Sequence, residues 1–101
     1  MGELKSIQRS HLKGLAHGLK PTVQIGKNGL TEAAVQTIGR ALDDHELIKI
    51  KFLSHKDERE ELSGTLAEKT GLELVALIGN IAILYRQASE PEKRTITLPP
   101  D

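Results

Sequence analysis

Residues 22–31 read TVQIGKNGLT, and this stretch decides the fold because a strand, a glycine loop and the start of a helix follow one another within it. In residues 22–25 apolar and polar side chains alternate, which is typical of a β-strand. Gly26-Lys27-Asn28-Gly29 follows at once and predicts a tight loop. Thr31 suits the N-cap of a helix. The apolar stripe of that helix consists of Ala34, Val35, Ile38, Ala41 and Leu42.

The segments on either side of this unit continue the alternation of helices and strands. Upstream, a helix is predicted by apolar residues at helical spacing, namely Leu4, Ile7, Leu12 and Leu15. Downstream, Asp43-Asp44-His45 indicates the end of the second helix, because two acids are unfavourable at a helix C-terminus. Residues 47–53 then alternate as a strand. Ser54 and Asp57 have the spacing of a capping box and predict a third helix that runs towards Thr70.

The chain closes its sheet with a hairpin. Gly79-Asn80 separates two apolar runs, 74–78 and 81–85, which is a strong hairpin signal. The predicted order is therefore α-β-α-β-α-β-β. Right-handed crossovers would join the first three strands, and the hairpin would add an antiparallel fourth. The predicted fold class is α/β: a single compact domain with a four-stranded mixed sheet packed by helices.

The domain is expected to span residues 1–86. Residues 87–101 are polar and contain prolines, so we interpret them as a C-terminal tail. Within this tail, residues 95–98 read Thr-Ile-Thr-Leu and could dock as an extra edge strand.

Composition excludes several classes of site. The 101 residues contain no cysteine, which excludes disulfides, thiolate metal sites and cysteine nucleophiles. Phe52 and Tyr85 are the only aromatic residues, too few for a platform on which single-stranded nucleic acid stacks. Any contact with RNA would therefore rely on its backbone, charge and shape. No apolar run approaches the ~20 residues of a membrane span or forms a signal peptide, so we expect a cytoplasmic protein.

Charge is distributed unevenly although the formal net charge is zero. Residues 1–51 hold eight Lys or Arg and five Asp or Glu, whereas residues 52–101 hold six and nine. Such asymmetry is typical of a protein with one face for a polyanion, although scattered surface charge is the alternative. Lys49 and Lys51 share one face of their predicted strand. The candidate phosphate contacts from charge placement are Lys13, Lys20, Lys49 and Lys51.

The glycine loop is the strongest candidate site. Gly26 and Gly29 let the backbone approach a ligand closely, and the helix start that follows favours an anion. Lys27 adds a cation at the tip, and Asn28 completes the GxxG pattern with which KH domains clamp nucleotide backbones. The alternative is a tight turn without a ligand. A Walker phosphate loop is excluded, because the run is too short and no Lys-Ser/Thr pair follows it.

Several stretches together resemble the CRM domain, named for chloroplast RNA splicing and ribosome maturation, and above all its stand-alone bacterial YhbY-like members. The resemblance lies in residues 11–17 (HLKGLAH), 19–21 (LKP), 25–31 (IGKNGLT), 41–42 (AL), 45–51 (HELIKIK), Thr70-Gly71, Ile78-Gly79 and 84–86 (LYR). It implies a fold similar to the C-terminal domain of bacterial initiation factor three, and RNA binding through Gly26, Lys27, Asn28 and Gly29. It also implies association with precursors of the large ribosomal subunit. The acidic run at residues 57–61 departs from a basic character.

Two other classes of function remain as alternatives. A ribonuclease could use His17 with Lys20, but no nucleophile, base and acid can be assembled, so we expect no catalytic residue. No histidine spacing suggests a metal site, and we expect no cofactor and no small-molecule substrate. The second alternative is a protein-interaction module that docks on a ribosomal protein or factor. The expected partner is ribosomal RNA of the large-subunit precursor, bound by a monomer.

Overall fold

The computed structural model describes residues 4–100 and confirms the predicted order of helices and strands. Two short 3-10 helices, η1 and η2, are added to that order. The elements are α1 (Ser6–Ala16), β1 (Val23–Ile25), α2 (Glu32–His45), β2 (Leu47–Phe52), η1 (Lys56–Glu58), α3 (Arg59–Thr70), β3 (Glu73–Ile78), β4 (Ile81–Tyr85) and η2 (Pro91–Lys93).

The four strands form one mixed sheet in the order β1-β2-β4-β3. β1 and β2 run parallel, joined by the crossover through α2, and β4 runs antiparallel to both β2 and β3. Strand β4 therefore inserts between two strands that precede it in the chain. This arrangement confirms the predicted mixed sheet with its terminal hairpin.

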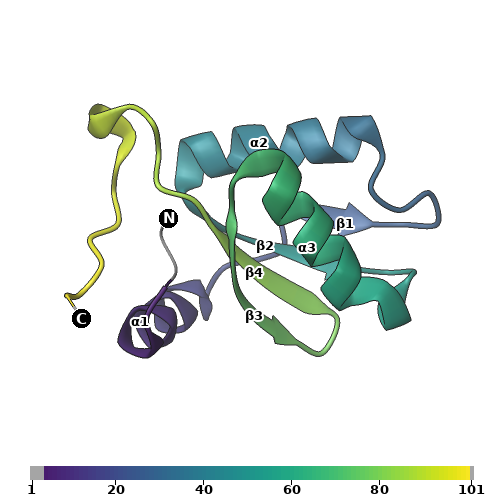
Figure 1. The fold of residues 1–101 in the computed structure, drawn as a ribbon, viewed down its shortest axis with the longest axis horizontal. Helices are drawn as coiled ribbons and strands as arrows, with labels where there is room; N and C mark the ends of the chain where they lie inside the picture. Colours follow the sequence, from purple (N-terminus) through teal and green to yellow (C-terminus); the bar gives the residue numbers. More distant parts are fainter. Residues whose placement is uncertain (1–3, 101) are drawn as a thin grey trace.

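Helices cover both faces of the sheet (Figure 1). α2 and α3 lie on one face, over the buried side chains of Ile48, Ile50 and Phe52. α1 lies on the other face, where Leu12 and Ala16 pack in a second, smaller cluster. That second cluster also includes Leu47, Val75, Ile83 and Tyr85. Alternate residues of β2 thus serve two cores, because successive side chains of a strand point to opposite faces.

The predicted capping box at Ser54 and Asp57 is wrong. The N–H of Ser54 donates to the carbonyl oxygen of Ile25 at 3.2 Å, which ties it to the end of β1. His55 then adopts a left-handed conformation with φ 58°, which cannot continue into a right-handed helix. α3 therefore begins only at Arg59, after η1.

The C-terminal segment docks without forming a strand. Among the described residues 87–100, the only regular element is η2. The backbone N–H groups of Thr95 and Ile96 donate to the carboxylate of Glu46, at 2.8 and 3.0 Å, rather than to a strand edge. Ile96 and Leu98 pack against the cluster beneath α1. The segment that was predicted to dock as an edge strand is therefore held by the buried carboxylate of Glu46 and not by a neighbouring strand.

Candidate nucleic-acid interface

The glycine loop is a closed turn with an exposed tip. The N–H of Gly29 donates to the carbonyl oxygen of Gly26 at 3.0 Å, and Lys27 and Asn28 lie exposed between them. Gly29 has φ +67°, a conformation that glycine adopts without strain. Gly26 does not have a positive φ, and nothing lies within 4 Å of where its Cβ would be. Only one of the two glycines is therefore required by the turn itself.

The helix that follows the loop begins as predicted. The Thr31 hydroxyl oxygen accepts a hydrogen bond from the N–H of Ala34 at 3.1 Å, which confirms Thr31 as the N-cap. Glu32 lies in the first turn, where its carboxylate already complements the helix dipole. The N-terminal end of α2 is therefore less favourable to a phosphate than the sequence suggested. The positive charge of the loop comes from the side chain of Lys27.

A histidine that the sequence did not single out as a site residue fixes the loop. The Nε2 atom of His55 lies 2.7 Å from the carbonyl oxygen of Lys27, and its Nδ1 atom lies 3.0 Å from a carboxylate oxygen of Glu58. These contacts raise the pKa of His55, the Lys27 carbonyl most strongly and then the Glu58 carboxylate. His55 therefore joins the loop to the segment that leads into α3. A contact between residues 28 apart leaves no local sequence pattern.

The lysines of β2 lie on the face of the sheet that carries α1. Lys51 is paired with Gln24 of β1 on one side and with Ile81 of β4 on the other. Lys49 also has a structural contact, because its ammonium group donates to the carbonyl oxygen of Leu19 at 3.0 Å. This bond ties the chain after α1 to the sheet. Lys49 thus holds its charge in a fixed position.

The other two candidate lysines separate. Lys13 and Lys49 line one hollow between α1 and the hairpin, together with His17, Ile78, Ile81 and Ile83. Lys20 lines a different, apolar groove with His45, beside Leu15, Leu19, Thr22, Leu47, Ile48 and Ile96. The structure therefore brings Lys13 and Lys49 together, with Lys51 further along the same face of β2. His17 and Lys20, the pair considered for catalysis, line separate hollows.

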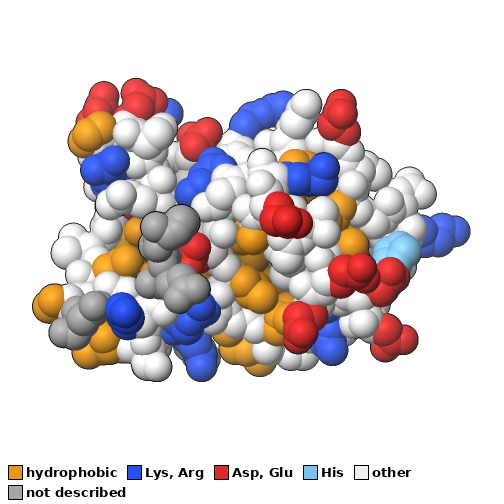
Figure 2. Space-filling model, viewed as in Figure 1, with side chains coloured by type: hydrophobic (Ala, Val, Ile, Leu, Met, Phe, Trp, Pro, Cys, Tyr) orange, Lys and Arg blue, Asp and Glu red, His pale blue; other side chains and the backbone are white. Residues whose placement is uncertain are grey.

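The loop end of the molecule carries mixed charge. Figure 2 shows Asp and Glu side chains gathered where η1 and α3 begin, beside Lys and His. These acids include Asp57 and Glu58 of η1 and Glu60 and Glu61 of the first turn of α3. An anionic ligand at the loop is therefore favoured on the side away from α3.

Residues 4–100 contain neither a metal-binding cluster nor a membrane-spanning helix. No three His, Asp or Glu side chains in this range lie close enough together to hold a metal ion. None of the helices described there combines the length and the apolar composition needed to cross a membrane.

Comparison with known proteins places this geometry in a family. Residues 4–86 match the model of the CRS1 / YhbY (CRM) domain. The chain belongs to the CRM domain family. The match ends at Arg86, directly after β4, so it covers the whole sheet and all three α-helices.

Relatives of this CRM domain have names that refer to RNA. A Haemophilus influenzae protein named "RNA-binding protein" is 42% identical over 91 residues, which span 89% of this chain and 92% of that protein. A Pseudomonas aeruginosa protein named "Probable RNA-binding protein" is 40% identical over 87 residues, 85% of this chain and 84% of that protein. The solution structure of a hypothetical Staphylococcus aureus protein, described as a candidate RNA binder, superposes with a TM-score of 0.79. The two sequences are 38% identical, and the superposition covers 96% of this chain and 100% of the Staphylococcus aureus chain.

Proposed function

We propose that this CRM domain is a non-catalytic RNA-binding protein that acts in the cytoplasm in assembly of the large ribosomal subunit. In this proposal the GxxG loop contacts the RNA backbone and the basic α1 side of the sheet contacts further phosphates. The RNA partner is supported by the names of the relatives. The link to the large subunit rests on the family resemblance alone.

The observation that carries the proposal is the meeting of lysines from distant segments on one face. Lys13 comes from α1 and Lys49 from β2, yet both line the same hollow. Lys51 lies two residues further along β2, about 7 Å away at the usual rise of a strand. Like charges placed together repel one another, and the phosphates of a polyanion neutralise them. The counterions that the polyanion then releases favour binding further.

A second candidate function is supported by apolar residues on the outer side of α1 and the turn after it. Ile7, Leu15 and Leu19 are 54%, 46% and 40% exposed. Apolar side chains gathered on one side of a domain are typical of a surface that docks on a protein. A ribosomal protein or assembly factor would be the partner in this case.

Salt dependence separates the two functions. We would measure binding to fragments of large-subunit ribosomal RNA by fluorescence anisotropy at several salt concentrations. The wild type would be compared with Lys27→Ala and with Lys69→Ala, an exposed lysine in the last turn of α3. Phosphate contacts predict that the affinity falls steeply as the salt concentration rises. The slope of the logarithm of the affinity against the logarithm of the salt concentration should become shallower by about one in Lys27→Ala and should be unchanged in Lys69→Ala.

The opposite result favours the protein partner. RNA binding that is absent, or indifferent to salt and to Lys27→Ala, would overturn the proposal. Salt-insensitive binding to an isolated large-subunit ribosomal protein, weakened by Leu15→Ser, would then support the docking function.

A further inference from the structure

The hollow between α1 and the β3–β4 hairpin has an apolar floor. Ile81 is paired with Ile78 across the hairpin, and all three isoleucines of the hollow come from β3 and β4. Their exposure is graded: Ile83 is 3% exposed, Ile81 is partly buried and Ile78 is 55% exposed. The floor therefore slopes from the core outward to the edge of the hairpin. Ile78 and Ile81 therefore offer apolar surface to a ligand, whereas Ile83 belongs to the core.

Polar and basic side chains form the rim of this floor. Lys13 and His17 are four residues apart at the C-terminal end of α1, so they lie on the same side of the helix. Lys49 stands opposite Ile83 on the neighbouring strand. Its ammonium group is held by the Leu19 carbonyl at 3.0 Å and, more weakly, by the His17 carbonyl at 3.5 Å. Cationic groups from α1 and from β2 thus border the apolar surface.

This combination selects the chemistry of the ligand. An apolar surface bordered by cations is complementary to a molecule that has a flat uncharged part next to anionic groups. A nucleotide within an RNA strand has both, a base and its flanking phosphates. A base inside a duplex is stacked between its neighbours, so only an unpaired base can lay its face on the isoleucines.

The aromatic residues of the chain cannot provide this contact. Phe52 is 0% exposed and Tyr85 is 5% exposed, so both are used in the cores. Proteins that bind unpaired bases usually stack them on aromatic side chains. The isoleucine floor is an apolar surface that this chain offers instead, and Lys13 and Lys49 line the same hollow.

We infer that the hollow formed by Lys13, His17, Lys49, Ile78, Ile81 and Ile83 binds one unpaired nucleobase, with Lys13 and Lys49 contacting the phosphates beside it. The inference rests on the proposed RNA binding and adds to it. The CRM domain would then prefer RNA with a bulged or looped nucleotide to a continuous duplex of equal charge.

The test compares two RNA hairpins with the same number of phosphates, both closed by a non-nucleotide linker so that neither has a loop of unpaired bases. One hairpin is fully paired, and the other carries a single bulged adenosine. Their affinities would be measured for the wild type, for Ile78→Ser and for Ile7→Ser. Ile78 and Ile7 are 55% and 54% exposed, so the two substitutions remove matched apolar surface, inside the hollow and away from it. We expect Ile78→Ser to weaken binding of the bulged hairpin about five-fold, with little effect on the paired hairpin. Ile7→Ser should affect neither.

Methyl NMR provides a readout that does not depend on affinity. A base lying on the floor should shift the methyl resonances of Ile78 and Ile81 upfield through its ring current when the bulged hairpin is added. The methyl group of Ile7 should not move in this way. The paired hairpin should not produce the shift.

The outcomes distinguish this inference from the proposed function. Salt-dependent binding that is equal for both hairpins, unaffected by Ile78→Ser and without the methyl shift would overturn the inference and leave RNA binding intact. Absence of binding to either hairpin, with binding to the large-subunit RNA fragments retained, would overturn the inference alone. Absence of binding to those fragments as well would overturn both. A methyl shift caused by an isolated ribosomal protein, without RNA binding, would reassign the hollow to a protein side chain.

Discussion

The Nε2 atom of His55 lies 2.7 Å from the carbonyl oxygen of Lys27, so a residue between β2 and α3 holds the tip of the glycine loop. Its other ring nitrogen faces a carboxylate oxygen of Glu58 at 3.0 Å. A neutral imidazole has one N–H and can donate to only one of these acceptors, whereas the protonated ring donates to both. The pKa of His55 is raised by the Lys27 carbonyl and then by Glu58.

This arrangement predicts that the loop is held more firmly at low pH. Because the folded pKa of His55 lies above its unfolded value near 6.5, its contribution to stability is full below that value. The contribution is lost as the pH rises through the folded pKa. We expect the melting temperature to fall between about pH 5.5 and about pH 8, and to fall less in His55→Asn. Asparagine is chosen because it tolerates the left-handed backbone at this position, with φ 58°.

His11→Asn serves as the control, because His11 lies exposed on α1, away from the loop. An identical pH dependence in the wild type and His55→Asn would show that the His55 contacts do not stabilise the loop.

The two glycines of the loop should respond differently to alanine. Gly29 has φ +67°, and a Cβ there would meet His55 only at 3.7 Å, so the cost of Gly29→Ala comes from the backbone rather than from a clash. We expect that substitution to lower the free energy of unfolding by about 1 kcal/mol. Gly26→Ala should leave it nearly unchanged, since Gly26 has neither a positive φ nor a neighbour within 4 Å.

Urea unfolding checks the stabilities, and RNA affinity adds a second distinction. If the backbone at Gly26 approaches the RNA, Gly26→Ala should weaken binding although it does not destabilise the fold. Equal destabilisation by the two substitutions would contradict this account of the turn.

Local sequence signals predicted most of the fold. Gly79-Asn80 specified its hairpin and Thr31 its helix start, because in each case the residues that decide the geometry are neighbours in the chain. The alternation of β2 also predicted that Lys49 and Lys51 share a face. The capping box at Ser54 failed, because the hydrogen bond from that residue to Ile25 overrides the local preference for a helix start.

The candidate site was less predictable than the fold. The sequence marked the glycine loop, but the contact that holds it joins residues 28 apart. Likewise, the bond from Lys49 to Leu19 joins residues 30 apart, and neither partner is unusual in its own segment. Lys20 was grouped with Lys13 because both are basic residues of the first half, yet they line different hollows. Such groupings depend on how α1 packs, which a local pattern does not specify.

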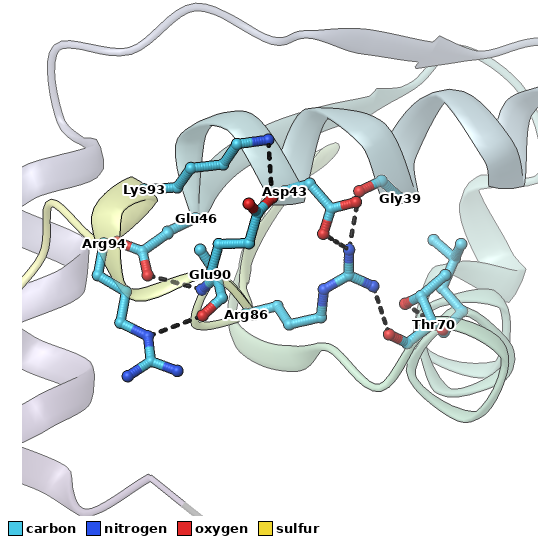
Figure 3. A network of polar contacts seen from close by, with 10 residues as sticks. Gly39, Asp43, Glu46, Thr70, Arg86, Glu90, Lys93 and Arg94 are labelled. Carbon is cyan, nitrogen blue, oxygen red and sulfur yellow. Dashed lines mark hydrogen bonds and ion pairs between the residues drawn. The ribbon is translucent and has the colours of Figure 1, made fainter.

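Arg86 should be difficult to replace, even by lysine. Its guanidinium donates to the Thr70 carbonyl of α3 at 2.6 Å and to the Gly39 carbonyl and the Asp43 carboxylate of α2, both at 2.8 Å (Figure 3). Lysine carries a single ammonium group and cannot reach acceptors on two helices at once. We expect Arg86→Lys to lower the free energy of unfolding by about 1–2 kcal/mol in urea titrations.

Arg40→Lys is the matched control, because Arg40 is exposed on α2. Loss of stability of the same size in both variants would show that the hydrogen bonds from Arg86 to α2 and α3 do not stabilise the fold.

Glu46 holds the C-terminal segment by its carboxylate (Figure 3). The side chain is fully buried and accepts N–H groups from Ala88, Thr95 and Ile96 at 2.7, 2.8 and 3.0 Å. Burial raises the pKa of this carboxyl, but the three backbone donors outweigh burial and hold the pKa below its ordinary value. The ionised form is therefore the one that binds the tail.

Glu46→Gln should release that segment. One acceptor oxygen becomes an NH₂ group facing a backbone donor, so we expect a loss of roughly 2 kcal/mol in the free energy of unfolding. Lys93 and Arg94 lie between the tethered residues, so trypsin should cleave there faster in the variant than in the wild type or in Glu68→Gln, an exposed control. Cleavage at equal rates would show that Glu46 does not hold the tail.

Acid should release the tail of the wild type in the same way. Because the folded pKa of Glu46 is depressed, its contribution to stability is present above the unfolded pKa of about 4.3 and is lost as the pH falls through the folded value. The methyl resonances of Ile96 and Leu98, which pack beneath α1, should therefore move towards their unfolded positions below about pH 4. In Glu46→Gln they should already be displaced at neutral pH and should not change further with acid. Only a titrating carboxylate produces that difference, because a tail held by apolar packing alone would behave alike in both proteins.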